Sequence, residues 1–200
     1  QLAGLSPRAC TLRRADLLLH LGRALVRLEQ HAEAWAAARE AFDLYLAEQA
    51  WEGAAQCCDI LFLADQPGSL AALGHGIWLA VTYPVDPELS VALLQRVVEE
   101  TPPDADGAAV AAVTAYYLVD LRARDPQRDH LLLYANQVLA TVARRHSGVD
   151  GQQNFNKWIE DMELGDPALF LPRLRNVVDV LVQDDWWFDR EALQAALPVE

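Results

Sequence analysis

The chain has 200 residues, 52% of them hydrophobic and 22% charged, so it can bury a sizeable core and lacks the composition of a disordered protein. Its 29 acidic residues outnumber its 16 basic residues and give a net charge of −13. This balance argues against a free-standing nucleic-acid binder, because such proteins present a basic surface.

The first 83 residues follow the apolar period of α-helices. Leucines recur at steps of three and four residues in the first segment, for which Thr11 is a candidate N-cap. In the next segment Trp35, Ala38, Phe42 and Tyr45 fall on one face. Pro67-Gly68 marks a turn, and Ser69 is a candidate cap for the helix after it. The pattern predicts helices over residues 11–29, 32–48, 51–64 and 70–82.

The rest of the chain is punctuated by Asx-Pro and Pro-Pro pairs. Asp86 and Asp189 are candidate N-caps, and Gly148 is a candidate helix terminator. Helices are predicted over residues 87–100, 106–123, 128–146, 152–163, 167–183 and 190–197. No run alternates with the period of a strand. We therefore expect an all-α protein of about nine helices, built from antiparallel helical hairpins with short loops.

A two-helix unit of about 35 residues repeats in the first half of the chain. Three pairs lie 36 residues apart and a fourth 35 apart: Ala54 and Ser90, Cys58 and Leu94, Leu61 and Val97, Pro67 and Pro102. The pattern resembles the tetratricopeptide repeat, with units at about 35–67 and 69–103. A competing register places the first helix on Leu18-x-x-Leu21-Gly22-x-x-Leu25. The resemblance covers about half the chain.

The resemblance implies a short α-solenoid, in which each hairpin buries its apolar face against its neighbours. Residues 1–103 would form the repeat-like hairpins. Residues 104–200 would continue as helical pairs with a C-terminal capping segment, in one continuous domain.

The resemblance also implies a groove for protein segments, lined by the first helix of each unit. Its candidate lining residues are Arg23, Arg27, Arg39, Asp43, His75 and Trp78. Arginine forks hold carboxylates bidentately, so an acidic peptide or a free C-terminus would suit the groove. The alternative interpretation makes the arginines a solvated helix face and Trp78 a core residue.

Three consecutive aromatic residues, Trp186, Trp187 and Phe188, lie between acidic residues near the C-terminus. Aromatic side chains supply large contact areas at interfaces, so an external partner is one interpretation. The other is a lid that covers the last apolar face of the solenoid, with Asp189 capping the final helix.

Signatures of catalysis and of metal or cofactor binding are not found in the sequence. The five histidines form no H-x-x-x-H pair, and there is no Gly-rich phosphate loop and no G-x-S-x-G motif. Adjacent Cys57 and Cys58 point about 100° apart on a helix and are interpreted as buried apolar residues, with a redox or metal role together with His75 as the alternative. We expect no cofactor, no metal and no enzymatic activity.

We expect a protein–protein interaction module: an adaptor, accessory subunit or assembly chaperone of a bacterial cytoplasm. The charge-free stretch over residues 66–85 contains prolines and glycines and is a poor membrane span. Two alternatives remain. One is a helical enzyme or small-ligand protein with a pocket near His75, Trp78 and Tyr83, and the other is a structural protein that buries Trp186–Phe188 between copies.

Overall fold

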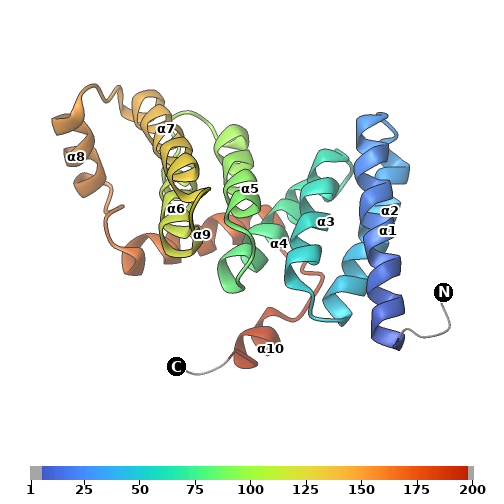
Figure 1. Ribbon diagram of the computed structural model, residues 1–200. Helices are drawn as coiled ribbons and strands as arrows, with labels where there is room; N and C mark the ends of the chain where they lie inside the picture. The colour runs from blue at the N-terminus through green and yellow to red at the C-terminus, as the bar shows by residue number, and fades with distance from the viewer. Residues whose placement is uncertain (1–5, 198–200) are drawn as a thin grey trace. The chain divides into compact units, whose positions relative to one another are not determined.

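A computed structural model describes residues 6–197 of the chain. Within that range the chain is helical without any strand, which confirms the predicted all-α class (Figure 1). Residues 6–197 form ten helices, one for each of the ten predicted ranges and close to the expected total of about nine. None of the helices in this range is both long enough and apolar enough to cross a membrane. The helices are α1 (Pro7–Arg27), α2 (His31–Ala47), α3 (Trp51–Leu63), α4 (Ser69–Thr82), α5 (Pro87–Glu100), α6 (Asp106–Arg122), α7 (Arg128–Ser147), α8 (Gln152–Asp161), α9 (Pro167–Val182) and α10 (Arg190–Ala195).

Two predicted N-caps, Thr11 and Ser69, are wrong. α1 begins before Thr11, because the Ser6 side chain accepts the N–H of Ala9 and Pro7 occupies the first helical position. α4 has Gly68 at its N-cap with φ 97°, a left-handed conformation that glycine adopts without strain. Ser69 is already helical, and its hydroxyl donates to the carbonyl of Leu61.

Other helix ends follow the sequence signals. Asp86 caps α5 as predicted, with its carboxylate accepting the N–H of Glu88 at 2.8 Å. α7 ends at Ser147, and Gly148 is its C-cap with φ 62°. The Asp189 side chain accepts the N–H of Ala192 at 3.0 Å and so caps α10.

Contacts between Cα atoms divide the chain into two compact units. Among the described residues, unit 1 comprises 6–83 and 180–197, and unit 2 comprises Pro84–Asp179. The chain therefore leaves unit 1 after α4 and returns to it at the end of α9. The predicted division of the chain at residue 103 stays a prediction.

In unit 1 consecutive helices pack on one another: α1 on α2, α2 on α3 and α3 on α4. Small residues bring the first pair close together. A Cβ atom added to Gly22 would lie 3.4 Å from the carbonyl oxygen of Ala34 and 3.5 Å from the Cβ of Ala38. Phe42 and Leu61 are fully buried in the core. The packing is that of stacked helical hairpins; its assignment to a particular repeat family stays a prediction.

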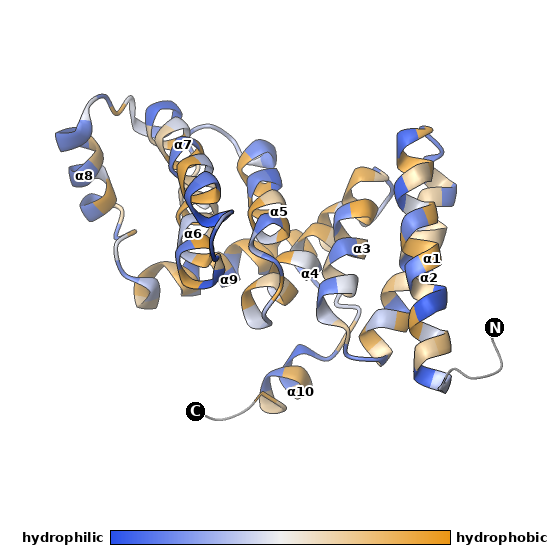
Figure 2. Ribbon diagram, viewed as in Figure 1, coloured by the Kyte–Doolittle hydropathy of each residue, from blue (hydrophilic) through white to orange (hydrophobic). Residues whose placement is uncertain are grey.

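In unit 2, α5 packs on α6 and α6 on α7. Two arginines join helices that are distant in sequence. Arg145 donates to the carbonyl of Val98 at 2.6 Å, and Arg173 pairs with Asp106 at 3.0 Å. The ribbon of α8 changes between hydrophilic and hydrophobic colours along its length, as expected of an amphipathic helix (Figure 2).

Candidate functional site

The candidate site lies in unit 1, where α2 and α4 present aromatic and basic side chains to a non-helical segment near the C-terminus. We call Trp35, Arg39, Phe42, His75 and Trp78 the aromatic face, and residues 185–189 the aromatic segment. The first three side chains recur along α2 at steps of four and three residues and therefore share one side of the helix. His75 and Trp78 share a side of α4 for the same reason.

Trp187 is the central side chain of the aromatic segment. Its ring stacks on the His75 ring, with 4.3 Å between centroids and 20° between planes. It also makes edge contacts with Phe42 at 5.4 Å and Trp35 at 6.1 Å. The Arg39 guanidinium carbon lies 4.4 Å from the centroid of the Trp187 ring. The ring is thus held by four side chains of the aromatic face, one of them a cation.

The two neighbours of Trp187 extend this contact. The Phe188 ring lies 5.1 Å from Trp78 and 5.3 Å from His75, measured between centroids. The Trp186 ring makes an edge contact with His75 at 5.2 Å. All three aromatic side chains of the segment are half-buried, whereas His75 is fully buried beneath them.

His75 also accepts a hydrogen bond from the segment: the backbone N–H of Trp187 donates to Nε2 at 3.1 Å. Burial lowers the pKa of His75 to about 4. The backbone of Ala71 and the carboxylate of Asp185 oppose this shift in the pKa, and Arg39 adds to it. The other ring nitrogen, Nδ1, is buried without a hydrogen bond of ordinary geometry, although the Ala71 backbone favours the protonated ring. The ring is therefore neutral at pH 7 and serves as an acceptor.

Six of the residues singled out from the sequence meet at this site: Arg39, His75, Trp78, Trp186, Trp187 and Phe188. The aromatic segment does cover an apolar surface, but this surface is on α2 and α4 and not on the last apolar face, where the lid was expected. The space beside His75 and Trp78, where an open groove or a ligand pocket was expected, holds the rings of the segment.

Three predicted residues lie outside these contacts. Asp43 forms an ion pair with Arg39 one turn away on α2. Arg23 donates to Gln56 on α3 at 3.2 Å. Arg27 is exposed in the last turn of α1.

Sequence reasoning missed Trp35 and Phe42 as site residues. Both were assigned to the inward face of their helix, and Phe42 is indeed fully buried. Their helical spacing places Trp35 and Phe42 on the same side of α2 as Arg39, which was a predicted binding residue. This spacing could have identified both as site residues.

The buried cysteines do not extend the site. Burial raises the pKa of the Cys57 thiol and of the Cys58 thiol, which disfavours the reactive thiolate. Within residues 6–197, no three His, Cys, Asp or Glu side chains gather in a way that could hold a metal ion.

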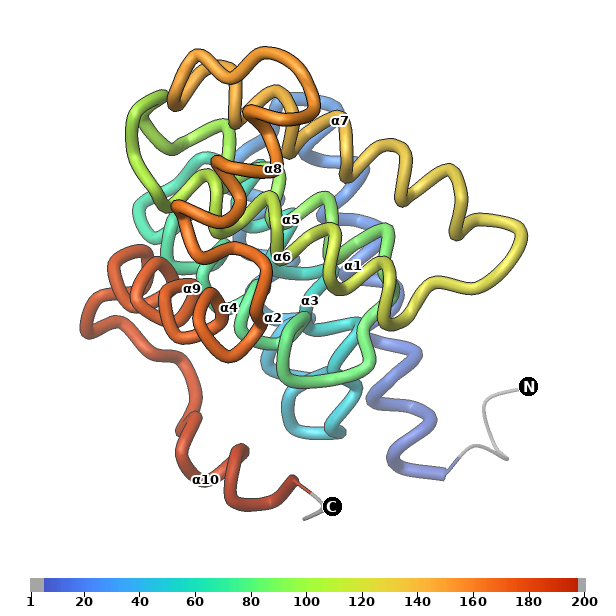
Figure 3. Tube along the Cα trace, turned by 90° about the vertical axis from the view of Figure 1, so that its left-hand side faces the viewer, coloured from blue at the N-terminus to red at the C-terminus, as the bar shows by residue number. Residues whose placement is uncertain are grey.

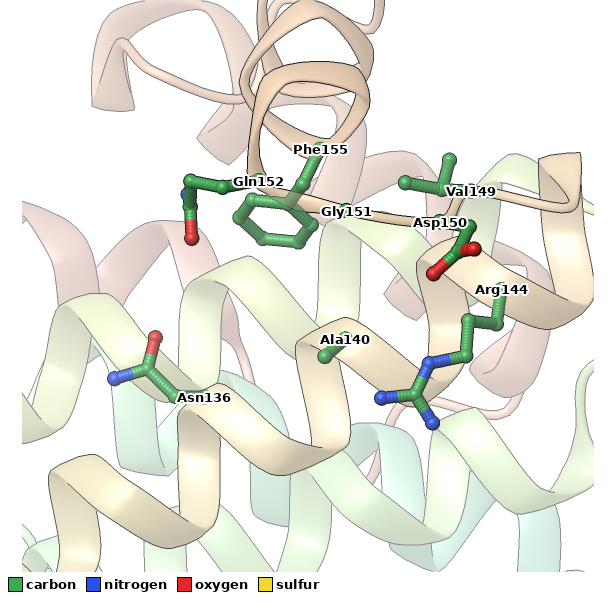
Figure 4. Close-up of a pocket in the computed structure, with 8 residues that line it drawn as sticks. All are labelled: Asn136, Ala140, Arg144, Val149, Asp150, Gly151, Gln152 and Phe155. Atoms are coloured by element: carbon green, nitrogen blue, oxygen red, sulfur yellow. The ribbon is translucent and has the colours of Figure 1, made fainter.

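Unit 2 contains two adjoining hollows that share Asn136 and Phe155, with volumes of about 420 and 330 Å³. In the larger one, Arg144 and Asp150 lie at one end and Asn136 and Gln152 at the other, with Phe155 between them (Figure 4). The smaller one is more apolar and is lined by residues of α6, α7, α8 and α9. The larger hollow has a mostly polar lining and is partly open to solvent, which is unlike the enclosed apolar sites that bind small molecules tightly.

Unit 2 also brings a serine, a histidine and an aspartate into one hydrogen-bonded row. Nδ1 of His146 lies 2.6 Å from the Ser147 hydroxyl, and Nε2 lies 3.2 Å from a carboxylate oxygen of Asp106. Acyl transfer needs free N–H groups to stabilise an oxyanion. The N–H groups of Gly148 and Val149, next to the serine, already donate to carbonyls of α7. The row is therefore best explained as a structural contact between α6 and α7.

Comparison of the chain with models of protein families, with curated proteins and with solved structures finds no match in any of the three.

Proposed function

We propose that this protein is a non-enzymatic interaction module, an adaptor, accessory subunit or assembly chaperone, and that its aromatic face binds a segment of another protein. One observation carries the proposal: this face already accommodates a non-helical segment from 112 residues away in the sequence, through a backbone N–H bond and a cluster of ring contacts. Backbone bonds supply affinity and side-chain pockets supply specificity in many peptide-binding proteins.

The composition of the face supports the proposal as well. Tryptophan, tyrosine and arginine dominate the energetics of interfaces, and the face offers two tryptophans and an arginine. The resemblance to tetratricopeptide repeats points the same way. With units at 35–67 and 69–103, the first helix of each unit would be α2 or α4, the two helices that bear the face.

Site-specific photocrosslinking in cells tests the proposal. The crosslinker p-benzoylphenylalanine replaces Asp43, which is 61% exposed beside Arg39. The host chain carries Trp186→Ala, Trp187→Ala and Phe188→Ala, so that its own segment does not occupy the face. We expect a covalent product with one segment of a second protein, because that segment would take the vacated position.

Two controls accompany this experiment. The same crosslinker at Tyr134, an exposed aromatic position in unit 2, should not yield that product. Adding Arg39→Glu to the host chain should abolish it. Identical products from positions 43 and 134, or none from position 43, would contradict the proposed function.

A further inference from the structure

Residues within and next to the aromatic segment contact one another, independently of the contacts that the segment makes with the aromatic face. Asp185 accepts the indole N–H of Trp187 at 3.3 Å, and Asp189 caps α10. The Arg190 guanidinium carbon lies 4.5 Å from the centroid of the Trp186 ring. Asp185 and Arg190 thus restrict the rings of Trp187 and Trp186, which lowers the entropic cost of placing these rings on a surface.

The aromatic segment packs on the aromatic face without becoming fully buried. Its three aromatic side chains are only partly buried. The helix that follows, α10, has no buried residue, and it stands clear of α1–α4 in two perpendicular views (Figures 1 and 3). Elements with few buried contacts open at the lowest free-energy cost. For the contact to open, the ring contacts and the hydrogen bond of Trp187 must break, whereas no buried residue of α10 has to move.

The surface of α4 beneath the aromatic segment is more deeply buried than the segment itself. His75 is fully buried and Trp78 is 8% exposed, so both are apolar core while the segment is in place. Lifting the segment would expose contiguous aromatic surface together with an unpaired Nε2 acceptor on His75. Such surfaces mark binding sites on soluble proteins. What recognises them best is a segment that offers the same rings and a backbone N–H.

We propose that residues 185–189 are an intramolecular ligand of the aromatic face, and that the partner presents a segment of the same chemistry, consecutive aromatic residues flanked by acidic ones, which binds only by displacing them. This inference rests on the proposed function and adds to it the chemistry of the partner and a built-in competitor. Asp184, Asp185 and Asp189 flank the rings, and Arg39 is the cation that meets the central ring.

A peptide that copies residues 183–192, carrying a fluorophore, tests the competition by titration against the full-length chain. We expect it to bind the Trp186→Ala/Trp187→Ala/Phe188→Ala variant at least tenfold more tightly than the wild type. A tethered segment competes at an effective concentration on the order of 1 mM, so a peptide with a Kd of about 0.1 mM would be weakened about tenfold.

Matched variants locate the binding. Glu191→Ala with Gln194→Ala alters exposed α10 residues outside the aromatic segment and should leave the affinity at the wild-type value. Arg39→Glu added to the triple-alanine variant should abolish binding. Equal affinity for wild type and triple-alanine variant would overturn the competition but leave the proposed function standing. A folded triple-alanine variant that does not bind the peptide would overturn the proposed function too.

Hydrogen exchange of the wild-type protein tests the same contact and does not depend on whether the triple-alanine variant folds. The backbone N–H of Trp187 is protected by its hydrogen bond to His75, so its hydrogen exchange reports whether the segment is seated. A saturating excess of the peptide should speed this exchange at least tenfold. Two results would contradict the proposal that residues 185–189 bind the aromatic face of their own chain. One is an unchanged exchange rate at saturation, and the other is a wild-type dimer in which each copy's segment occupies the other copy's face.

Discussion

At the scale of single residues, His75 links the two parts of the site. Because Nε2 accepts the N–H of Trp187, the neutral ring carries its proton on Nδ1. Protonation would turn Nε2 into a donor that faces another donor, and it would place a charge in a buried position beside Arg39. The ring can therefore hold the aromatic segment only while it is neutral.

The stability of the protein should fall as the pH is lowered from about 6.5 to about 4. In this window the unfolded chain binds a proton at His75 and the folded chain does not, because burial has lowered the pKa of the folded state to about 4. Below pH 4 both states bind the proton and the loss levels off, at a total on the order of 3 kcal/mol. Urea unfolding at a series of pH values measures it.

His75→Phe is the matched variant for this pH series, since it keeps an aromatic ring at the position and removes the titrating group. Carboxylates elsewhere titrate equally in both chains, so the difference between wild type and variant isolates His75. We expect the unfolding free energy of the wild type to decline more steeply than that of the variant. Parallel pH profiles would show that His75 is not buried in its neutral form.

At the scale of helices, the packing of α3 on α2 depends on a glycine. A Cβ atom added to Gly53 would lie 2.5 Å from Cδ1 of Tyr45, whose ring is 4% exposed. The Tyr45 hydroxyl donates to Asp16 on α1 at 2.5 Å, so the ring is held at both ends and cannot simply swing aside. The absence of a side chain at Gly53 thus sets the spacing between α2 and α3.

Gly53→Ala should destabilise the protein by about 1–3 kcal/mol, as overpacking of a buried site does. The sign is informative, because alanine in place of glycine normally stabilises a helix by about 1 kcal/mol. Urea unfolding monitored by circular dichroism measures the change. Gly165→Ala is the control, since its Cβ would meet nothing within 4 Å and its effect should stay within about 0.5 kcal/mol. A stabilising Gly53→Ala would refute this packing.

At the scale of the whole molecule, the charge of −13 is unevenly spread. Residues 1–60 carry 6 basic and 8 acidic side chains, whereas residues 61–200 carry 10 and 21. The stretch 183–191 alone has four acidic residues and one basic residue. An acidic segment over the Arg39 side of the face lets electrostatic attraction help to hold it in place.

Replacing Trp186, Trp187 and Phe188 by alanine should make the protein associate with itself. The substitution uncovers the aromatic face, and exposed apolar patches of this kind drive association. Light scattering after gel filtration, over a hundredfold range of concentration, should give a constant mass for the wild type and a rising mass for the variant. A variant that stays monomeric and binds no apolar dye would show that the face is not uncovered.

Local features of the sequence determined the helices of this protein. The period of Trp35, Ala38, Phe42 and Tyr45 placed the inward face of α2 correctly, and Asp86 and Gly148 marked real helix ends. Helical periodicity and capping depend on interactions between residues a few positions apart, within about one helical turn. They can therefore be predicted from the sequence without the fold. The N-cap of α1, Ser6, was missed: Thr11 was taken as the cap, but it lies inside the helix, where its hydroxyl donates to the carbonyl of Pro7.

Only the tertiary structure decided which of the candidate site residues contact one another. The sequence marked His75, Trp78, Arg39 and Trp186–Phe188 separately, and it placed the first three on an open groove. Only a contact across 112 residues shows that the chain's own segment occupies that surface and keeps His75 buried and neutral. Contacts between distant segments depend on how whole helices pack, and no local period or cap encodes that arrangement.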